Sequence, residues 1–212
     1  MKFHLIGGFN LKSKNLVRLF VSTLLIGTIS TLLTSFFVKS QVYMEFLQPL
    51  DLFEVFGLLV FFTGLGMVFS LVSQMGFFAY LTINQIALGL FRSYWLPIQV
   101  FLIFVTLFEL VYLRYTAADE NSSLIAYILV SLVLFVYGWI ISGIKAKQTN
   151  KKAFVPALFF MIVITTIEWV PGLRTSGGEY AWLMIIPLLV CNAYQLLVLH
   201  RLTGSNHAGE NN

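Results

Sequence analysis

The fold of this chain depends on residues 73–95, which read SQMGFFAYLTINQIALGLFRSYW. The stretch is as apolar as a transmembrane helix, yet it holds Asn84 and Gln85 side by side in its middle and Arg92 near its end. If it crosses a membrane, every segment after it changes side. The alternatives are an interfacial helix, a re-entrant hairpin or an extension of the neighbouring helices.

The composition indicates an integral membrane protein built of helices. Hydrophobic residues make up 58% of the chain and charged residues 10%, whereas soluble domains have about 25% charged residues. A transmembrane helix needs about 20 apolar residues, and a barrel strand only about 10. Six runs are long enough for helices, with ends uncertain by several residues: 16–38, 52–72, 94–112, 124–144, 153–170 and 181–199. We predict an all-α, polytopic helix bundle in a single domain, 1–212, with a basic N-terminal segment, 1–15, and a disordered polar tail, 204–212.

The basic residues predict that both termini are cytoplasmic. Loops on the cytoplasmic side of a membrane carry an excess of Lys and Arg. With six crossings and residues 73–93 kept on the cytoplasmic side, ten of the 13 Lys and Arg residues share that side. A seventh crossing through 73–93 would place the two strongest basic segments, 12–18 and 145–152, on opposite sides. We therefore expect six crossings.

Polar residues inside the apolar runs are candidate intramembrane sites, because they are costly in hydrocarbon. They are Glu109, Glu168, Asn192 and Gln195. The two carboxyl groups lie near the outer ends of their helices, so the alternative is that they reach interfacial water or pair with nearby arginines. The two amides share one helix face. They either hold the 73–93 segment by hydrogen bonds or line a small polar cavity.

The first helix carries small residues at four-residue intervals: Thr23, Gly27, Thr31 and Ser35. This spacing lines one face and lets another helix approach closely. The face predicts either packing within the bundle or an interface with a second copy or a partner.

The loop after the fourth run has four lysines within eight residues. It could bind anionic lipid headgroups, at about 1 kcal/mol for each basic residue near the surface, or an acidic partner, or serve only to orient the chain. With the amides of the 73–93 segment, it gives the candidate partner contacts: Asn84, Gln85, Lys145, Lys147, Gln148, Lys151 and Lys152.

Catalytic and metal-binding motifs are absent from the sequence. It contains no H-E-x-x-H, no P-loop, no G-x-G-x-x-G and no G-x-S-x-G. The three histidines lie far apart, and Cys191 is the only cysteine. We expect no enzyme activity, no cofactor and no metal. The net charge of +4 indicates how the chain is oriented in a membrane and does not indicate nucleic-acid binding.

Several long segments resemble the KinB-signalling pathway activation protein (KbaA) family of spore-forming Bacillus relatives. They are FSLVSQMGFFAYLTINQ, RSYW, IKAKQTNKKAFVPALFFM, IEWVPGLR and LLVCNAYQLL. The likeness runs from about NLVRLF to LHRL and is weaker in the first 14 residues and in the tail. It implies a multi-pass protein of the cell membrane that helps a membrane-bound sensor histidine kinase feed the sporulation phosphorelay. It implies no catalytic residues.

Two function classes remain beside this one. The polar residues within the membrane also fit a small transporter or channel for a signal molecule, although the paired halves typical of transporters are not evident. A lipid-handling enzyme would need a catalytic motif, which the sequence lacks. Loss of kinase-dependent signalling on deletion of the gene would favour the accessory role.

Overall fold

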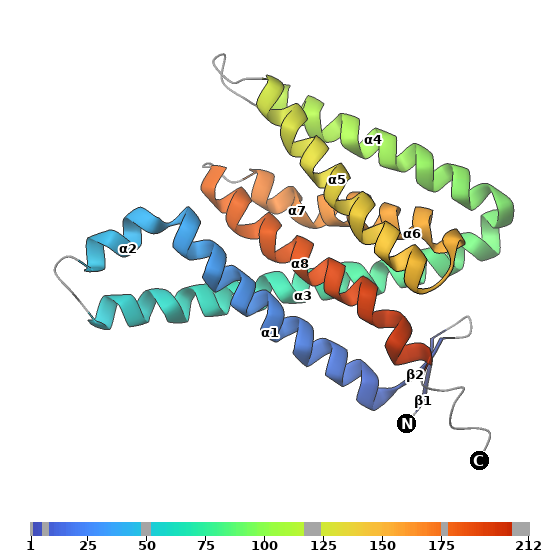
Figure 1. Ribbon diagram of the computed structural model, residues 1–212, viewed down its shortest axis with the longest axis horizontal. Helices are drawn as coiled ribbons and strands as arrows, with labels where there is room; N and C mark the ends of the chain where they lie inside the picture. The colour runs from blue at the N-terminus through green and yellow to red at the C-terminus, as the bar shows by residue number, and fades with distance from the viewer. Residues whose placement is uncertain (1, 6–8, 48–51, 117–123, 175–177, 205–212) are drawn as a thin grey trace. The chain divides into compact units, whose positions relative to one another are not determined.

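The computed structural model describes residues 2–5, 9–47, 52–116, 124–174 and 178–204. Long helices dominate (Figure 1). They are α1 (Ser13–Val38), α2 (Ser40–Leu47), α3 (Leu52–Phe91), α4 (Trp95–Thr116), α5 (Leu124–Gln148), α6 (Phe154–Phe159), α7 (Thr165–Arg174) and α8 (Gly178–Gly204). Short helical turns join some of them: η1 (Arg92–Tyr94), η2 (Lys151–Ala153) and the π-helical η3 (Phe160–Ile164).

The chain divides into two compact units, which are described separately below. Unit 1 comprises Met1–Phe77 and Glu168–Asn212, and unit 2 comprises Phe78–Ile167. Helices α3 and α7 each contribute residues to both units. The prediction of a single domain stays a prediction.

The N-terminal segment departs from the all-α prediction. Strands β1 (Lys2–Leu5) and β2 (Phe9–Lys12) pair antiparallel, with Lys2 opposite Lys12 and Leu5 opposite Phe9. An isolated two-stranded hairpin is marginally stable in water. Here β2 continues directly into α1 at Ser13, so the hairpin is anchored to a long helix. The other elements of the described residues are helical, as predicted.

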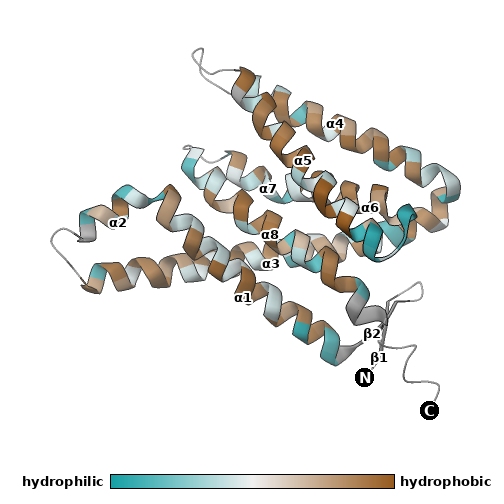
Figure 2. Cartoon of the chain, in the orientation of Figure 1, coloured by the Kyte–Doolittle hydropathy of each residue, from teal (hydrophilic) through white to brown (hydrophobic). Residues whose placement is uncertain are grey.

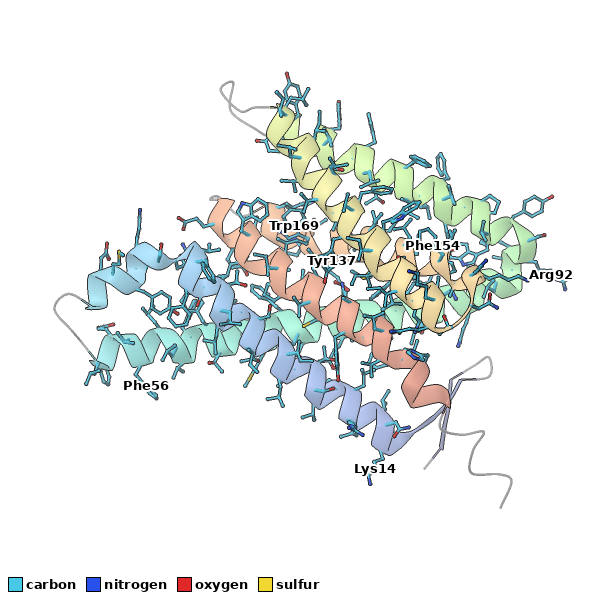
Figure 3. All side chains as sticks on the ribbon, viewed as in Figure 1. Lys14, Phe56, Arg92, Tyr137, Phe154 and Trp169 are labelled. Atoms are coloured by element: carbon cyan, nitrogen blue, oxygen red, sulfur yellow. The ribbon has the colours of Figure 1, made fainter. Side chains whose placement is uncertain are left out.

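Helix α3 answers part of the question raised by residues 73–95. It runs unbroken for 40 residues, which excludes a re-entrant hairpin and makes the stretch an extension of the second apolar run. At 1.5 Å per residue, the helix is about 60 Å long, twice the thickness of a hydrocarbon core of about 30 Å. It ends at Phe91, and Arg92 then adopts a positive φ of 45° at the bend that leads into α4 (Figure 3).

Unit 1 is built on the close approach of α1, α3 and α8, and α1 and α8 lie side by side (Figure 1). A Cβ atom added at Gly27 would lie 2.0 Å from Ser70 Oγ and 2.7 Å from Cys191 Sγ. The predicted small-residue face of α1 therefore packs inside this unit. Its members Thr23, Thr31 and Ser35 are fully buried, and they are not an exposed surface for another chain.

Unit 2 is built on α4, α5, α6 and the end of α3. Tyr80 of α3 donates a hydrogen bond to the Pro156 carbonyl (3.1 Å), and its ring centroid lies 4.9 Å from that of Phe160. Gly138 on α5 leaves room for Met161 and Ile162 of η3. Residues 157–164 are buried throughout, so the helix that contains η3 forms the core of this unit.

Five helical stretches are long and apolar enough to cross a membrane: Lys14–Val38, Leu52–Tyr112, Tyr127–Gln148, Lys151–Arg174 and Gly178–His200. The second of them contains both the second and the third predicted runs, because α3 passes into α4 with only η1 between them. Figure 2 shows the apolar colouring along these helices. The count of six crossings and their direction stay predictions.

Exposed apolar side chains run along whole helix faces. On α1, the face opposite the small residues carries Val17, Val21, Leu25, Ile29 and Leu33, all exposed. Soluble monomers rarely expose apolar patches larger than a few hundred Å². Such a face is compatible with contact with lipid.

Candidate functional site

A buried group of polar side chains lies within unit 1, and we call it the polar cluster: Ser73 of α3, Glu168 of α7, and Asn192 and Gln195 of α8. The first, third and fourth of these are 0% exposed, and Glu168 is 7% exposed. Burying polar groups in an apolar surrounding is costly unless they bond to one another. Three helices meet here through side chains that bond to one another, although Glu168 Oε1 and Gln195 Oε1 are buried without a hydrogen-bond partner.

The hydrogen bonds of the polar cluster form a chain. The Gln195 amide donates to Ser73 Oγ, Ser73 Oγ donates to Asn192 Oδ1, and Asn192 Nδ2 donates to Glu168 Oε2, each at 2.6 Å. Gln195 Nε2 also lies 3.3 Å from the Cys191 carbonyl, one turn earlier on α8. These hydrogen bonds connect α3, α7 and α8 at one point within unit 1.

Gly76 makes the position of Glu168 sterically possible. A Cβ atom added at Gly76 would lie 1.7 Å from Glu168 Oε1, so the carboxyl group lies directly against the backbone of α3. Oε1 is buried and has no hydrogen-bond partner, in contrast to Oε2. The carboxyl group is thus bonded on one oxygen only.

The structure separates the four candidate intramembrane residues. It brings Glu168, Asn192 and Gln195 together, and it leaves Glu109 exposed on α4 in unit 2. The alternative in which Glu168 reaches interfacial water is wrong for this structure, since the side chain is buried against α3 and α8. Sequence reasoning missed Ser73 and Gly76, which lie three residues apart and hence on one face of α3.

Two further side chains form hydrogen bonds between the helices of unit 1. Trp169 of α7 (Figure 3) is buried, and its indole N–H donates to the Ala181 carbonyl of α8 at 2.8 Å. The Gln74 amide lies 3.4 Å from the Phe20 carbonyl of α1. These bonds fix α7 against α8 and α1 against α3 within unit 1.

The candidate partner contacts of unit 2 differ in exposure. Lys147, Gln148, Lys151 and Lys152 are exposed, whereas Lys145 is 7% exposed. Lys145 therefore does not belong to the exposed surface predicted for the lysine loop, because its position on α5 faces the interior. The turn itself is held by the Thr149 hydroxyl, which donates to the Lys145 carbonyl at 2.8 Å, and by Asn150, which accepts from the Lys152 amide.

Asn84 has an internal role in unit 2. Its Oδ1 accepts hydrogen bonds from the Trp95 indole at 2.8 Å and from the Gln99 amide at 3.3 Å. These bonds span the bend between α3 and α4 and hold it closed. Its neighbour Gln85 is half-buried.

Titratable side chains of the described residues are the candidate ligands for a metal ion. Among the described residues, no group of three or more His, Cys, Asp and Glu side chains is placed to hold a metal ion. The described ion pair joins Lys39 to Glu179 within unit 1, and both side chains are partly exposed. The polar cluster can position helices and can exchange a proton, but it offers no nucleophile beside a general base.

Comparison with known proteins gives a consistent result over most of the chain. The family model described as KbaA, KinB-signalling pathway activation in sporulation, matches residues 27–202. The KinB-signaling pathway activation protein of Bacillus subtilis (strain 168) is 41% identical over 192 residues, which cover 89% of this chain and 97% of that protein. No solved structure matches this chain.

Proposed function

The chain belongs to the KbaA family, and we propose that it is a membrane accessory protein that activates a sensor histidine kinase of the KinB pathway in sporulation. The observation that carries the proposal is the match to a protein of that name along nearly the full length of both chains. The matched region includes every member of the polar cluster. The family name describes activation of a signalling pathway, and the proposal assigns no catalytic step to this chain.

The proposed location is the cell membrane. Five helical stretches are long and apolar enough to cross it, and exposed apolar faces such as that of α1 suit a lipid surrounding. The basic N-terminal segment and the basic end of α5 support cytoplasmic placement of these two parts under the positive-inside rule. The protein would then meet the kinase either within the bilayer or at the cytoplasmic surface.

Activation requires that this protein bind one signalling state of the kinase better than another. A ligand that binds both states equally shifts no equilibrium, and each 1.4 kcal/mol of differential affinity shifts the populations about tenfold. The exposed basic turn between α5 and α6 is the best-supported contact surface in unit 2, and it consists of Lys147, Gln148, Lys151 and Lys152. Lys145 and Asn84 are left out, because one is buried and the other bonds Trp95.

The direct test is replacement of the relative in Bacillus subtilis. This chain would be expressed in a strain that lacks its own KinB-signaling pathway activation protein, and KinB-dependent sporulation would be counted. We expect sporulation to be restored only while the kinase gene is present. Normal protein level without any restoration would contradict the proposed function.

A matched pair of variants tests the contact surface. Gln148→Trp places a bulky ring on the exposed end of α5 and keeps every lysine that orients the chain. Gln41→Trp makes the same change at an exposed position of α2 in unit 1. We expect the first to lower KinB-dependent sporulation and the second to leave it unchanged. Equal effects at equal protein levels would remove the basic turn as the contact.

A further inference from the structure

The surroundings of Glu168 contain no compensating cation among the described residues. Helix α3 has no charged residue between Val55 and Phe91, and it places Ser73 and Gly76 next to the carboxyl group. On α7 the nearest charge is the exposed Arg174, six residues or about 9 Å along the axis. An ionised Glu168 would therefore be a buried charge without a counter-ion.

The remaining titratable groups near the cluster do not supply one. Helix α8 brings the thiol of Cys191, which lies 3.8 Å from the Thr23 carbonyl of α1. Glu179, at the other end of α8, is exposed and pairs with Lys39. Helix α1 contributes Lys14 and Arg18 only at its beginning, nine and five residues before Thr23.

The hydrogen bonds also fit an ionised carboxylate poorly. Such a group accepts several donors when it is stabilised by bonding, but here one amide reaches Oε2 and Oε1 has no partner. An unpaired charge in a low-dielectric interior costs far more than an unpaired neutral carbonyl oxygen. If Glu168 is neutral, the group left unpaired against Gly76 is only a neutral carbonyl oxygen.

We propose that the polar cluster is a proton-binding site, in which Glu168 holds on Oε2 a proton taken from the aqueous phase and donates a hydrogen bond to the side-chain oxygen of Asn192. Asn192 Nδ2 lies 2.6 Å from Oε2, and the proposed bond places the amide oxygen of Asn192 at that position instead. The amide of Asn192 turns over so that its oxygen faces Glu168 and its nitrogen faces Ser73. Amide oxygen and nitrogen occupy equivalent positions in such a turn, and their assignment follows the hydrogen-bond network.

Ser73 accommodates the reversed bond by rotation of its hydroxyl group. Its oxygen then accepts from both Asn192 and Gln195, and its own proton turns toward the carbonyl four residues earlier on α3. The same kind of bond, from a hydroxyl to the carbonyl at i−4, is made by Thr23, Thr31 and Ser70 in this unit. Proton binding therefore reverses the direction of two hydrogen bonds, the one between Glu168 and Asn192 and the one between Asn192 and Ser73. The three helices keep their contacts.

Infrared spectroscopy of the full chain in lipid or detergent tests the proposal. A protonated carboxylic acid has a carbonyl band that a carboxylate lacks. At neutral pH we expect this band in the wild type and its loss in Glu168→Gln, which keeps the shape of a neutral acid and cannot ionise. Glu109→Gln is the matched control at an exposed site on α4, and it should leave the band in place.

Stability against pH gives a second readout with a defined sign. A glutamate in the unfolded chain ionises near pH 4.3, whereas in the proposed cluster the proton stays on Glu168 at neutral pH. The folded state then binds more protons, so stability falls as pH rises. Between pH 5 and 7, the folding equilibrium constant of the wild type should fall about tenfold per pH unit relative to that of Glu168→Gln.

Should Glu168→Gln fail to fold, ¹³C-labelled glutamate in the wild type replaces it, because the other glutamates of the described residues are exposed. We expect the acid band to shift on labelling. Absence of an acid band that depends on Glu168 or on labelled glutamate would overturn the proposal. So would equal pH dependence of the wild type and Glu168→Gln.

Discussion

The substitution Gly66→Ala should weaken the packing of α1 on α3, whereas Gly64→Ala, two residues away on the same helix, should not. A Cβ atom at Gly66 would lie 2.7 Å from the Cα of Thr28, which is 0.7 Å inside the 3.4 Å where ordinary contact begins. The clashing atom belongs to a helix backbone and cannot rotate away. At Gly64 the new methyl group meets no atom within 4 Å.

The magnitude follows from the difference between the two variants. Both gain the same helix propensity, about 1 kcal/mol for Gly→Ala, and this gain cancels in the comparison. Overpacking of a close contact costs about 1–3 kcal/mol, so Gly66→Ala should be less stable than Gly64→Ala by that amount. Unfolding in detergent micelles, followed by helix circular dichroism, measures the two free energies of unfolding. Equal stabilities would refute the close approach of α1 and α3 at Gly66.

Three other outcomes can be measured separately. A reporter fused after Lys147 should report the cytoplasm, as the positive-inside rule requires, and an external signal would overturn the six-crossing topology. Asn84→Leu should lower the free energy of unfolding by about 1–3 kcal/mol, because the buried Trp95 indole loses its acceptor; an unchanged thermal midpoint would contradict this. Lys39→Ala should cost less than about 1 kcal/mol, because its ion pair with Glu179 is partly exposed; a larger loss in the same unfolding assay would show that the pair is structurally important.

Apolar runs in the sequence predicted the long helices, because hydrocarbon length and backbone hydrogen bonding leave few alternatives. The joining of two runs was harder to predict. Asn84 and Gln85 suggested a break in the membrane segment, yet a helix interior accepts both amides, and Asn84 finds its donors on α4. The hairpin at Lys2–Lys12 was missed since two four-residue strands give little periodic signal.

The polar cluster shows where sequence reasoning ends. Glu109 and Glu168 looked equivalent, each a carboxyl group near the outer end of an apolar run. Only the packing of α7 between α3 and α8 distinguishes them, and it depends on Gly76, which leaves space for one carboxyl group. Ser73 is too common a residue type in membrane helices to be singled out before its neighbours are known. Asn192 and Gln195 could be predicted as a pair because three-residue spacing puts them on one face.

The length of α3 has a consequence for its placement in the membrane location that we propose. From Val55 to Phe91 no charged side chain marks where the helix should stop, so many windows of about 20 residues are equally good spans for the insertion machinery. Hydropathy alone would let α3 slide along the membrane normal. The bonds from Ser73 to Asn192 and Gln195 select one vertical register, since α8 is bounded by Glu179 at one end and by His200 and Arg201 at the other. In a membrane, we therefore expect the depth of α3 to be set by its bonds to α8, a helix that follows it in the chain.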